Sequence, residues 1–169
     1  SLVVSDANGC STASSKNVTV NNLPMAAINP QNAQTCFGVP VTLTASGGNT
    51  YLWSTNETTA AISVNPVSTT TYDVTVTNAV GGCSATASAT VTVNNSVSLS
   101  EQHADLNCFN GNDGNIDITV AGGTAPISFL WNDNNTNEDR LSLSAGTYSV
   151  TATGSDGCAA TISVVLTEP

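Results

Sequence analysis

The chain has 169 residues, of which 8% are charged and 40% hydrophobic, and its formal net charge is -10. Its only basic residues are Lys16 and Arg140. They are too few to neutralise a run of phosphates, so nucleic acid and anionic membrane surfaces are excluded as partners. A disordered chain would be richer in charge, whereas Val and Thr recur here with period two, which predicts an all-β protein.

The first predicted element is a β-hairpin within residues 1–24. Its turn is Asp6-Ala-Asn-Gly-Cys10, and Asn, Asp and Gly are the residues that hairpin turns need. Two strands around a Gly-Cys turn return at residues 74–95 and again at 150–169. The strands after Cys10 and Cys83 end alike, in Val-Thr-Val-Asn-Asn. The chain is therefore built from repeats.

Two complete modules follow, at residues 25–95 and 96–169. Each contains, in order, a strand with a cysteine, a Gly-Gly pair, a tryptophan, a Thr-Tyr pair and the final hairpin. We interpret residues 1–24 as the C-terminal hairpin of a truncated preceding module. Strands of the second complete module are predicted at 115–121, 127–132, 140–144, 146–153 and 159–167. Short strands at this spacing are typical of small Ig-like β-sandwiches.

The five cysteines predict structural disulfides, because the chain has one histidine and no Cys-x-x-Cys motif. Pairing Cys36 with Cys83, and Cys108 with Cys158, gives each small module one disulfide. Each would close a loop of about 50 residues and contribute roughly 4 kcal/mol in the chain-entropy model. Cys10 would then pair with a cysteine outside the chain. The alternative is that all are free thiols in a cytosolic protein.

The aromatic residues allow two interpretations. Trp53 and Trp131 lie at the same repeat position, either packed in each core beside the disulfide or exposed as platforms for sugar rings. Their recurrence favours the core. Phe109, which follows Cys108 in a polar loop, is the aromatic residue that we expect to be exposed. No ligand-binding residue is assigned from these patterns.

Catalytic groups are sparse. His103 is the single histidine and lies near the boundary between modules, and no pair of carboxylates is placed in a cleft, so we expect no enzymatic activity. Calcium is the one cofactor that the sequence allows, because Asp105, Asp113, Asp133 and Asp139 lie in loops dense in oxygen donors. The same residue types stabilise turns without a metal, and both interpretations stay open.

Residues 105–169 contain a series of motifs in order: Cys108-Phe-Asn-Gly-Asn-Asp-Gly, Ile116-Asp-Ile-Thr-Val-Ala-Gly-Gly-Thr-Ala-Pro126, Phe129-Leu-Trp131, Leu141-Ser-Leu-Ser-Ala-Gly-Thr-Tyr148, Asp156-Gly-Cys158 and Glu168-Pro169. With these motifs, the segment resembles the SprB repeat of large surface adhesins from gliding Bacteroidota. Residues 1–24 look like the end of another such unit. Residues 25–95 look more like PKD-like or bacterial Ig-like modules, since they lack a Gly-Thr-Ala-Pro motif and a Glu-Pro ending.

This resemblance implies a segment of a filamentous adhesin that the type IX secretion system exports to the cell surface, where it serves attachment and gliding motility. The modules would form its stalk, with neighbouring modules as their partners and external surfaces or polysaccharide as partners of the parent protein. Under tension, each expected disulfide would keep about 50 residues, roughly 170 Å, from extending.

Two rival hypotheses stay open. One is a carbohydrate- or surface-binding module that uses Phe109 and residues 132–139. The other is an accessory domain of a secreted hydrolase. No apolar run long enough to span a bilayer occurs in the sequence, so membrane insertion is not expected.

Overall fold

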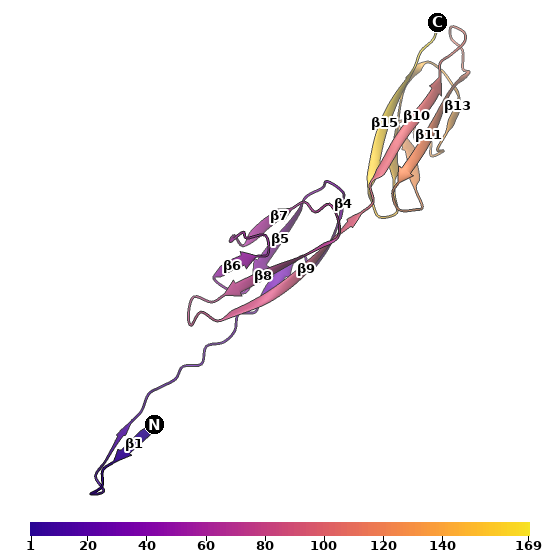
Figure 1. Cartoon of the computed structure of the whole chain (residues 1–169). Helices are drawn as coiled ribbons and strands as arrows, with labels where there is room; N and C mark the ends of the chain where they lie inside the picture. Colours follow the sequence, from indigo (N-terminus) through magenta and orange to yellow (C-terminus); the bar gives the residue numbers. More distant parts are fainter.

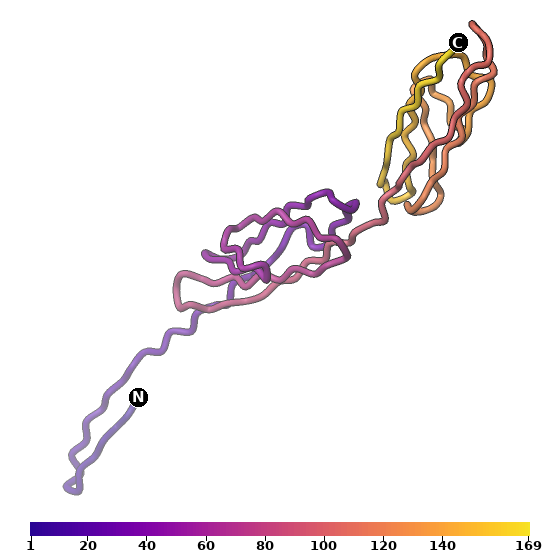
Figure 2. The backbone as a smooth tube through the Cα atoms, turned by 45° about the horizontal axis from the view of Figure 1, so that its top comes forward, coloured from indigo at the N-terminus to yellow at the C-terminus, as the bar shows by residue number.

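The computed structural model describes all residues from Ser1 to Pro169 and contains fifteen β-strands and no helices. It has no helix that could cross a lipid bilayer. The molecule is elongated, with a thin N-terminal hairpin followed by two β-sandwiches placed end to end (Figure 1). The same separation of the three parts is seen from a second direction (Figure 2).

The N-terminal hairpin consists of β1 (Leu2–Ser5) and β2 (Ser11–Ser14), paired in antiparallel register. Its turn is held by one carboxylate oxygen of Asp6, which accepts hydrogen bonds from the backbone N–H groups of Asn8 and Cys10, each at 2.9 Å. Every residue of both strands is exposed. The predicted hairpin is therefore present but contributes to neither hydrophobic core.

The first sandwich has two sheets that face each other across one core. Strand β4 runs parallel to β9, and all other pairs are antiparallel. The smaller sheet has the order β3 (Ala27–Asn29), β5 (Val41–Ser46), β7 (Ala61–Val64). The larger sheet has the order β4 (Asn32–Cys36), β9 (Ser84–Asn94), β8 (Thr70–Thr77), β6 (Thr50–Trp53).

Alternating Val and Thr residues build this core, because successive side chains of a strand point to opposite faces of its sheet. Val74, Val76 and Val91 are fully buried, and the threonines between them face outward. Trp53 is 2% exposed, and its indole Nε1 donates a hydrogen bond to the carbonyl oxygen of Thr59 at 2.9 Å. The indole thus keeps a polar partner inside an apolar environment.

The second sandwich repeats the arrangement with two three-stranded sheets. One contains β10 (Val97–Ala104), β11 (Gly114–Gly122) and β13 (Arg140–Leu143), in that order. The other contains β12 (Ser128–Trp131), β14 (Gly146–Thr153) and β15 (Ala159–Leu166). Ile116, Trp131, Val150 and Leu166 are at the centre of its core. Like Trp53, Trp131 is 2% exposed.

The predicted all-β class with Ig-like sandwiches is confirmed, and so is the placement of both tryptophans in the cores. The five strands predicted after residue 114 are present within one or two residues of their expected ends. Two details were wrong. Strand β10 was not predicted, and Cys108, expected on a strand, lies in the loop that follows β10. The boundaries 1–24, 25–95 and 96–169 stay a prediction.

Candidate functional site: the junction between the two sandwiches

The connection between the sandwiches is only two residues long. Strand β9 ends at Asn94 and β10 begins at Val97. The carbonyl oxygen of Ser96 accepts a hydrogen bond from the backbone N–H of Gly123 at 2.9 Å. A Cβ atom on Gly122, whose φ is 70°, would lie 2.3 Å from the same oxygen, so this close approach requires glycine. The linker is therefore held against the second sandwich.

A disulfide joins the two sandwiches at this junction. Cys36 of β4 is bonded to Cys158 of the β14–β15 turn, with an S–S distance of 2.07 Å and a Cα–Cα distance of 5.6 Å. The expected pairs Cys36–Cys83 and Cys108–Cys158 are therefore wrong. Each module was expected to contain its own disulfide, but the one disulfide present connects two modules, and it does not lie beside either tryptophan.

Strand length explains why the expected pairs do not form. Cys36 lies opposite Asn94, the last residue of β9, whereas Cys83 immediately precedes Ser84, the first residue of that strand. From Cys83 to Asn94 the chain advances along all eleven residues of β9, which is roughly 35 Å. A disulfide requires Cα atoms within about 7 Å of each other. The two cysteines of one sandwich thus lie at opposite ends.

Local hydrogen bonds fix the Cys36 side of the bond. The side chain of Thr35 is buried, and its hydroxyl donates to the carbonyl oxygen of Val39 at 2.8 Å. The backbone N–H of Val39 in turn donates to the carbonyl oxygen of Cys36 at 3.0 Å. This turn ends β4 and presents the Cys36 side chain at the end of the sandwich.

The Cys158 side is fixed through Asp156. The carboxylate of Asp156 accepts hydrogen bonds from the hydroxyl of Thr124 at 2.6 Å and from the backbone N–H of Cys158 at 3.1 Å. Both bonds lower the pKa of Asp156 below its usual range, and the bond from Thr124 has the larger effect. Cys158 itself is 1% exposed. The β14–β15 turn is thus tied to the neighbouring loop and holds the sulfur in place.

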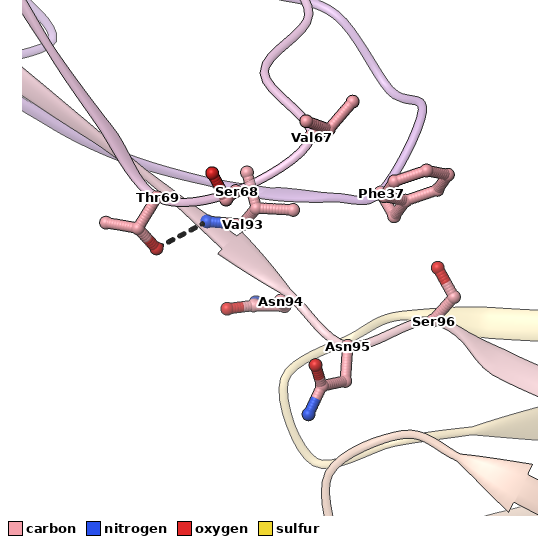
Figure 3. Close-up of a pocket in the computed structure, with 8 residues that line it drawn as sticks. All are labelled: Phe37, Val67, Ser68, Thr69, Val93, Asn94, Asn95 and Ser96. Atoms are coloured by element: carbon pink, nitrogen blue, oxygen red, sulfur yellow. Dashed lines mark hydrogen bonds between the residues drawn. The ribbon is translucent and has the colours of Figure 1, made fainter.

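A shallow groove runs beside the linker on the side of the first sandwich (Figure 3). The backbone N–H of Val93 donates to the hydroxyl of Thr69 at 3.2 Å within it. No ionisable side chain lines the groove. Its lining residues are Phe37, Val67, Ser68, Thr69, Val93, Asn94, Asn95 and Ser96.

The other three cysteines are free thiols. Cys10 is exposed in the turn of the N-terminal hairpin, and Cys108 is exposed in the loop between β10 and β11. Cys83 is half-buried in the β8–β9 turn, at the end of the first sandwich that faces the hairpin. The expected partner of Cys10 outside the chain stays a prediction.

The four calcium candidates do not come together. The carboxylate of Asp105 accepts from the backbone N–H of Thr167 at 2.7 Å, and that of Asp139 accepts from the backbone N–H of Ile118 at 2.9 Å. Asp113 accepts from the side-chain amide of Asn107 at 2.6 Å. No group of three or more His, Cys, Asp or Glu residues is placed to hold a metal ion.

The fourth candidate, Asp133, forms a bidentate ion pair with Arg140, whose two terminal nitrogens lie 3.0 and 2.7 Å from its oxygens. The guanidinium also lies 5.2 Å from the ring centroid of Trp131. Each candidate thus has its own protein donor. Calcium binding stays a prediction, which isothermal titration of the full chain with calcium would test.

Phe109 is 69% exposed, as expected from its polar loop. Residues 132–139 form the turn after β12, next to the Trp131 indole, which donates to the carbonyl oxygen of Asn137 at 2.7 Å. His103 lies on β10, with its Nδ1 2.8 Å from a carboxylate oxygen of Glu101. No hydrogen bond or ion pair connects Phe109, residues 132–139 and His103 with one another.

The class of protein defined by this fold and junction is a tandem array of Ig-like β-sandwiches. The family model described as the SprB repeat matches residues 100–136. This part of the chain is therefore similar to the SprB repeat, while the PKD-like character of residues 25–95 stays a prediction. No curated protein matches the chain.

Several solved structures are similar in fold. One is a C-terminal 282-residue fragment of intimin in complex with the intimin-binding domain of its translocated receptor, at 9% identity and a TM-score of 0.49, covering 88% of this chain. This chain covers 64% of that fragment, which is less than two thirds of its length. A second is a chimeric titin Z1Z2 tandem, at 14% identity and a TM-score of 0.34, and the match covers 85% of this chain and 99% of that one. A third consists of the four N-terminal Ig domains of Dscam1, at 14% identity and a TM-score of 0.36, and the match covers 96% of this chain and 52% of that one.

Proposed function

We propose that this chain is a non-enzymatic stalk segment of an extracellular, cell-surface adhesin, in which a disulfide carries tension from one module to the next. The observation that supports this proposal is the Cys36–Cys158 bond between two sandwiches that already share a two-residue linker. Two covalent connections at one junction restrict bending and twisting far more than a linker alone. A structural role explains why the junction groove has no ionisable lining residue.

The path of force through the molecule follows from the positions of the two cysteines. Tension applied at the chain ends passes along β4 to Cys36, crosses the disulfide to Cys158 and leaves along β15. The residues between the two cysteines lie outside this path. With a sequence separation of 122, they represent about 410 Å of extended chain at about 3.4 Å per residue. Most residues of both hydrophobic cores lie within this protected loop, whereas Ile28, Val164 and Leu166 lie outside it.

Single-molecule pulling of the full chain from its two ends tests this path directly. Without reductant, extension should be limited to the residues before Cys36 and after Cys158. With reductant, the contour length should increase by about 410 Å as both sandwiches unfold. A matched control is Cys108→Ser, which removes a thiol outside the junction and should behave like the unaltered chain. Equal extensions in both redox states would rule out the stalk mechanism.

An extracellular location agrees with the disulfide, since such bonds persist in oxidising compartments. The SprB repeat within residues 100–136 supports an adhesin as the parent protein and, through it, export by the type IX secretion system and a part in surface attachment and gliding motility. Protease treatment of intact bacteria that express the parent protein tests the location. Protection of the chain from external protease would contradict it.

The rival hypotheses of a sugar-binding module and of a hydrolase accessory domain are tested separately. If the chain is a stalk segment, the full chain should bind no sugar on a glycan array. Binding that is lost on Phe109→Ala would instead support a carbohydrate site at this exposed ring. Only a catalytic domain in the same parent protein would support the accessory-domain hypothesis.

A further inference from the structure

The segment Val18–Asn22 has the same sequence as Val91–Asn95, but the surroundings of the two segments differ. Val91 is fully buried in the first core, and β4 pairs with β9 along this stretch. Val18 and Val20 are 84% and 88% exposed, and no strand pairs with their segment. Residues 18–22 thus expose two apolar side chains and an unpaired backbone edge, whereas the identical residues 91–95 lie beside a partner strand.

The β8–β9 turn of the first sandwich packs against the end of this open segment. The side-chain amide of Asn78 donates to the carbonyl oxygen of Asn22 at 3.2 Å. The φ of Gly81 is 80°, which favours glycine, and a Cβ atom there would overlap the side chain of Asn21, so the turn approaches the segment closely. The sulfur of Cys83 lies 3.8 Å from the carbonyl oxygen of Asn21.

The junction between the two sandwiches indicates which partner Cys83 would have, because Cys158 occupies the equivalent position there. There, the turn cysteine Cys158 is bonded to Cys36, and Cys36 lies opposite Asn94. Asn94 is the counterpart of Asn21 in the repeated sequence. Cys83, the counterpart of Cys158, is therefore next to the position where a parallel partner strand would bring a cysteine.

We propose that Val18–Asn22 is the docking edge for a strand like β4, which belongs to a sandwich of the same architecture, runs parallel to the segment and forms a disulfide with Cys83. This inference rests on the proposed stalk function, because it makes the Cys36–Cys158 bond one member of a series. Backbone pairing to an open edge provides the register, and burial of Val18 favours the association.

The far end of the second sandwich fits the same series. The backbone N–H of Leu106 donates to the carbonyl oxygen of Thr167 at 3.0 Å, so the segment leading to Cys108 lies along the end of the last strand, as β4 lies along β9. Cys108 thus occupies the position of Cys36. Each sandwich presents one cysteine for the module before it and one for the module after it.

The bond forms by oxidation of two thiols. Each thiol loses one proton and one electron, and the two sulfurs join. A small-molecule disulfide such as oxidised glutathione accepts the two electrons and two protons and becomes two thiols.

The proposal can be tested by supplying a sandwich whose last strands come from the N-terminal hairpin. A copy of residues 25–73 is placed directly before Leu2 of the full chain, so that the hairpin of residues 2–14 supplies its last strands. The copy brings a second Cys36 next to Val18–Asn22. After oxidation with glutathione, mapping of disulfide-linked peptides should find the added cysteine joined to Cys83. The native Cys36–Cys158 bond in the same sample shows that the existing modules have folded.

Two outcomes would overturn the proposal. One is a bond between the added cysteine and Cys10, which is the pairing within one module. The other is an added cysteine that stays a thiol while Cys36–Cys158 forms. As matched controls, Cys83→Ser should leave the added cysteine free, whereas Cys10→Ser should leave its bond unchanged. If the bond to Cys83 is absent but reductant still lengthens the chain under tension, this inference fails and the stalk function stands.

A second measurement applies if the added copy does not fold, and it uses the unaltered full chain. The probe is a synthetic peptide of residues 30–41, carrying its cysteine as a mixed disulfide with glutathione. Transfer to Cys83 should be about tenfold faster than transfer to Cys10 or Cys108, because docking raises the local concentration of the peptide. A scrambled peptide should show no such preference, and equal selectivity of the two peptides would contradict the proposal.

Discussion

The two sandwiches differ most at the segment that leads to the first cysteine of each. In the first sandwich this segment is strand β4, which is held to β9 by a regular parallel backbone ladder. In the second, residues 105–113 form an irregular loop that is held by one backbone bond, from Leu106 to Thr167, and by several side chains. The carboxylate of Asp105 accepts from the backbone N–H of Thr167, and that of Asp113 accepts from the side chain of Asn107.

The comparison shows that one architecture can position its cysteine in two ways. Backbone pairing does not change with pH, whereas a carboxylate accepts hydrogen bonds best when it is ionised. The acidic residues are distributed accordingly. Residues 25–95 contain only Glu57 and Asp73, and most of the other acids lie after residue 96. We therefore expect the two sandwiches to respond alike to loss of core packing and differently to acid.

The largest expected effect is the loss of a core tryptophan. Replacing Trp53 or Trp131 by Ala should destabilise the altered sandwich by about 3–5 kcal/mol, because each indole fills the centre of its core. In each variant the remaining tryptophan is the only one in the chain, so its fluorescence during urea unfolding reports on the other sandwich. This second transition should not move. Leu52→Ala, at a side chain 52% exposed, is a control with little expected effect.

The next effect is an acid sensitivity that is greater in the second sandwich than in the first. Four aspartates of this sandwich accept hydrogen bonds that lower their pKa below the usual 3.8. The main donor is the backbone of Thr167 for the first, and the side chains of Asn107, Arg140 and Thr124 for the other three, in chain order. A lowered folded-state pKa means stability that is present above about pH 4 and is lost as pH falls through the folded-state value. The four aspartates are Asp105, Asp113, Asp133 and Asp156.

Unfolding of the two sandwiches between pH 2 and 6 checks this expectation. In a Trp53→Phe chain, the Trp131 signal should show a falling midpoint as the pH drops below about 4. The reciprocal Trp131→Phe chain reports on the first sandwich through Trp53, whose midpoint should change less. Parallel loss of both midpoints would show that the carboxylate bonds are not what separates the two sandwiches.

A smaller effect is expected at Arg140, which has no charged counterpart in the first sandwich, since Ala61 begins the matching strand β7. Arg140→Lys should lower the stability of the second sandwich by about 1 kcal/mol, because lysine cannot keep both the bidentate pair with Asp133 and the planar contact over Trp131. Urea unfolding measures the change. A lysine variant as stable as the parent would show that charge alone suffices.

The smallest effect is expected for Asp113→Asn, which keeps the shape of the side chain but removes its charge. The bond from Asn107 should weaken, and amide hydrogen exchange in residues 105–113 should become faster while the core strands stay protected. The change should also reduce the acid sensitivity of this loop. Unaltered exchange would mean that the backbone bond of Leu106 alone holds the segment.

The sequence predicted the fold much better than it predicted the junction. Alternating Val and Thr, Gly-Cys turns and recurrent tryptophans are local signals, and the structure agrees with them. Pairing of cysteines is not local. A pairing of the two cysteines within each module and a pairing between neighbouring modules both give one disulfide per repeat. The repeat pattern therefore does not distinguish them. The signal that could have separated these cases is the long strand between Cys83 and Asn94, which places the two cysteines of a module at opposite ends.

The Cys36–Cys158 bond also affects how the molecule withstands proteolysis. The β8–β9 turn and the loop of residues 132–139 are exposed, and both lie between the two bonded cysteines. A single cut of the backbone at either place produces two fragments that are still joined through sulfur. To separate the molecule into two pieces with a single cut, a protease would have to act outside this covalent ring, or a reductant would have to open the ring as well.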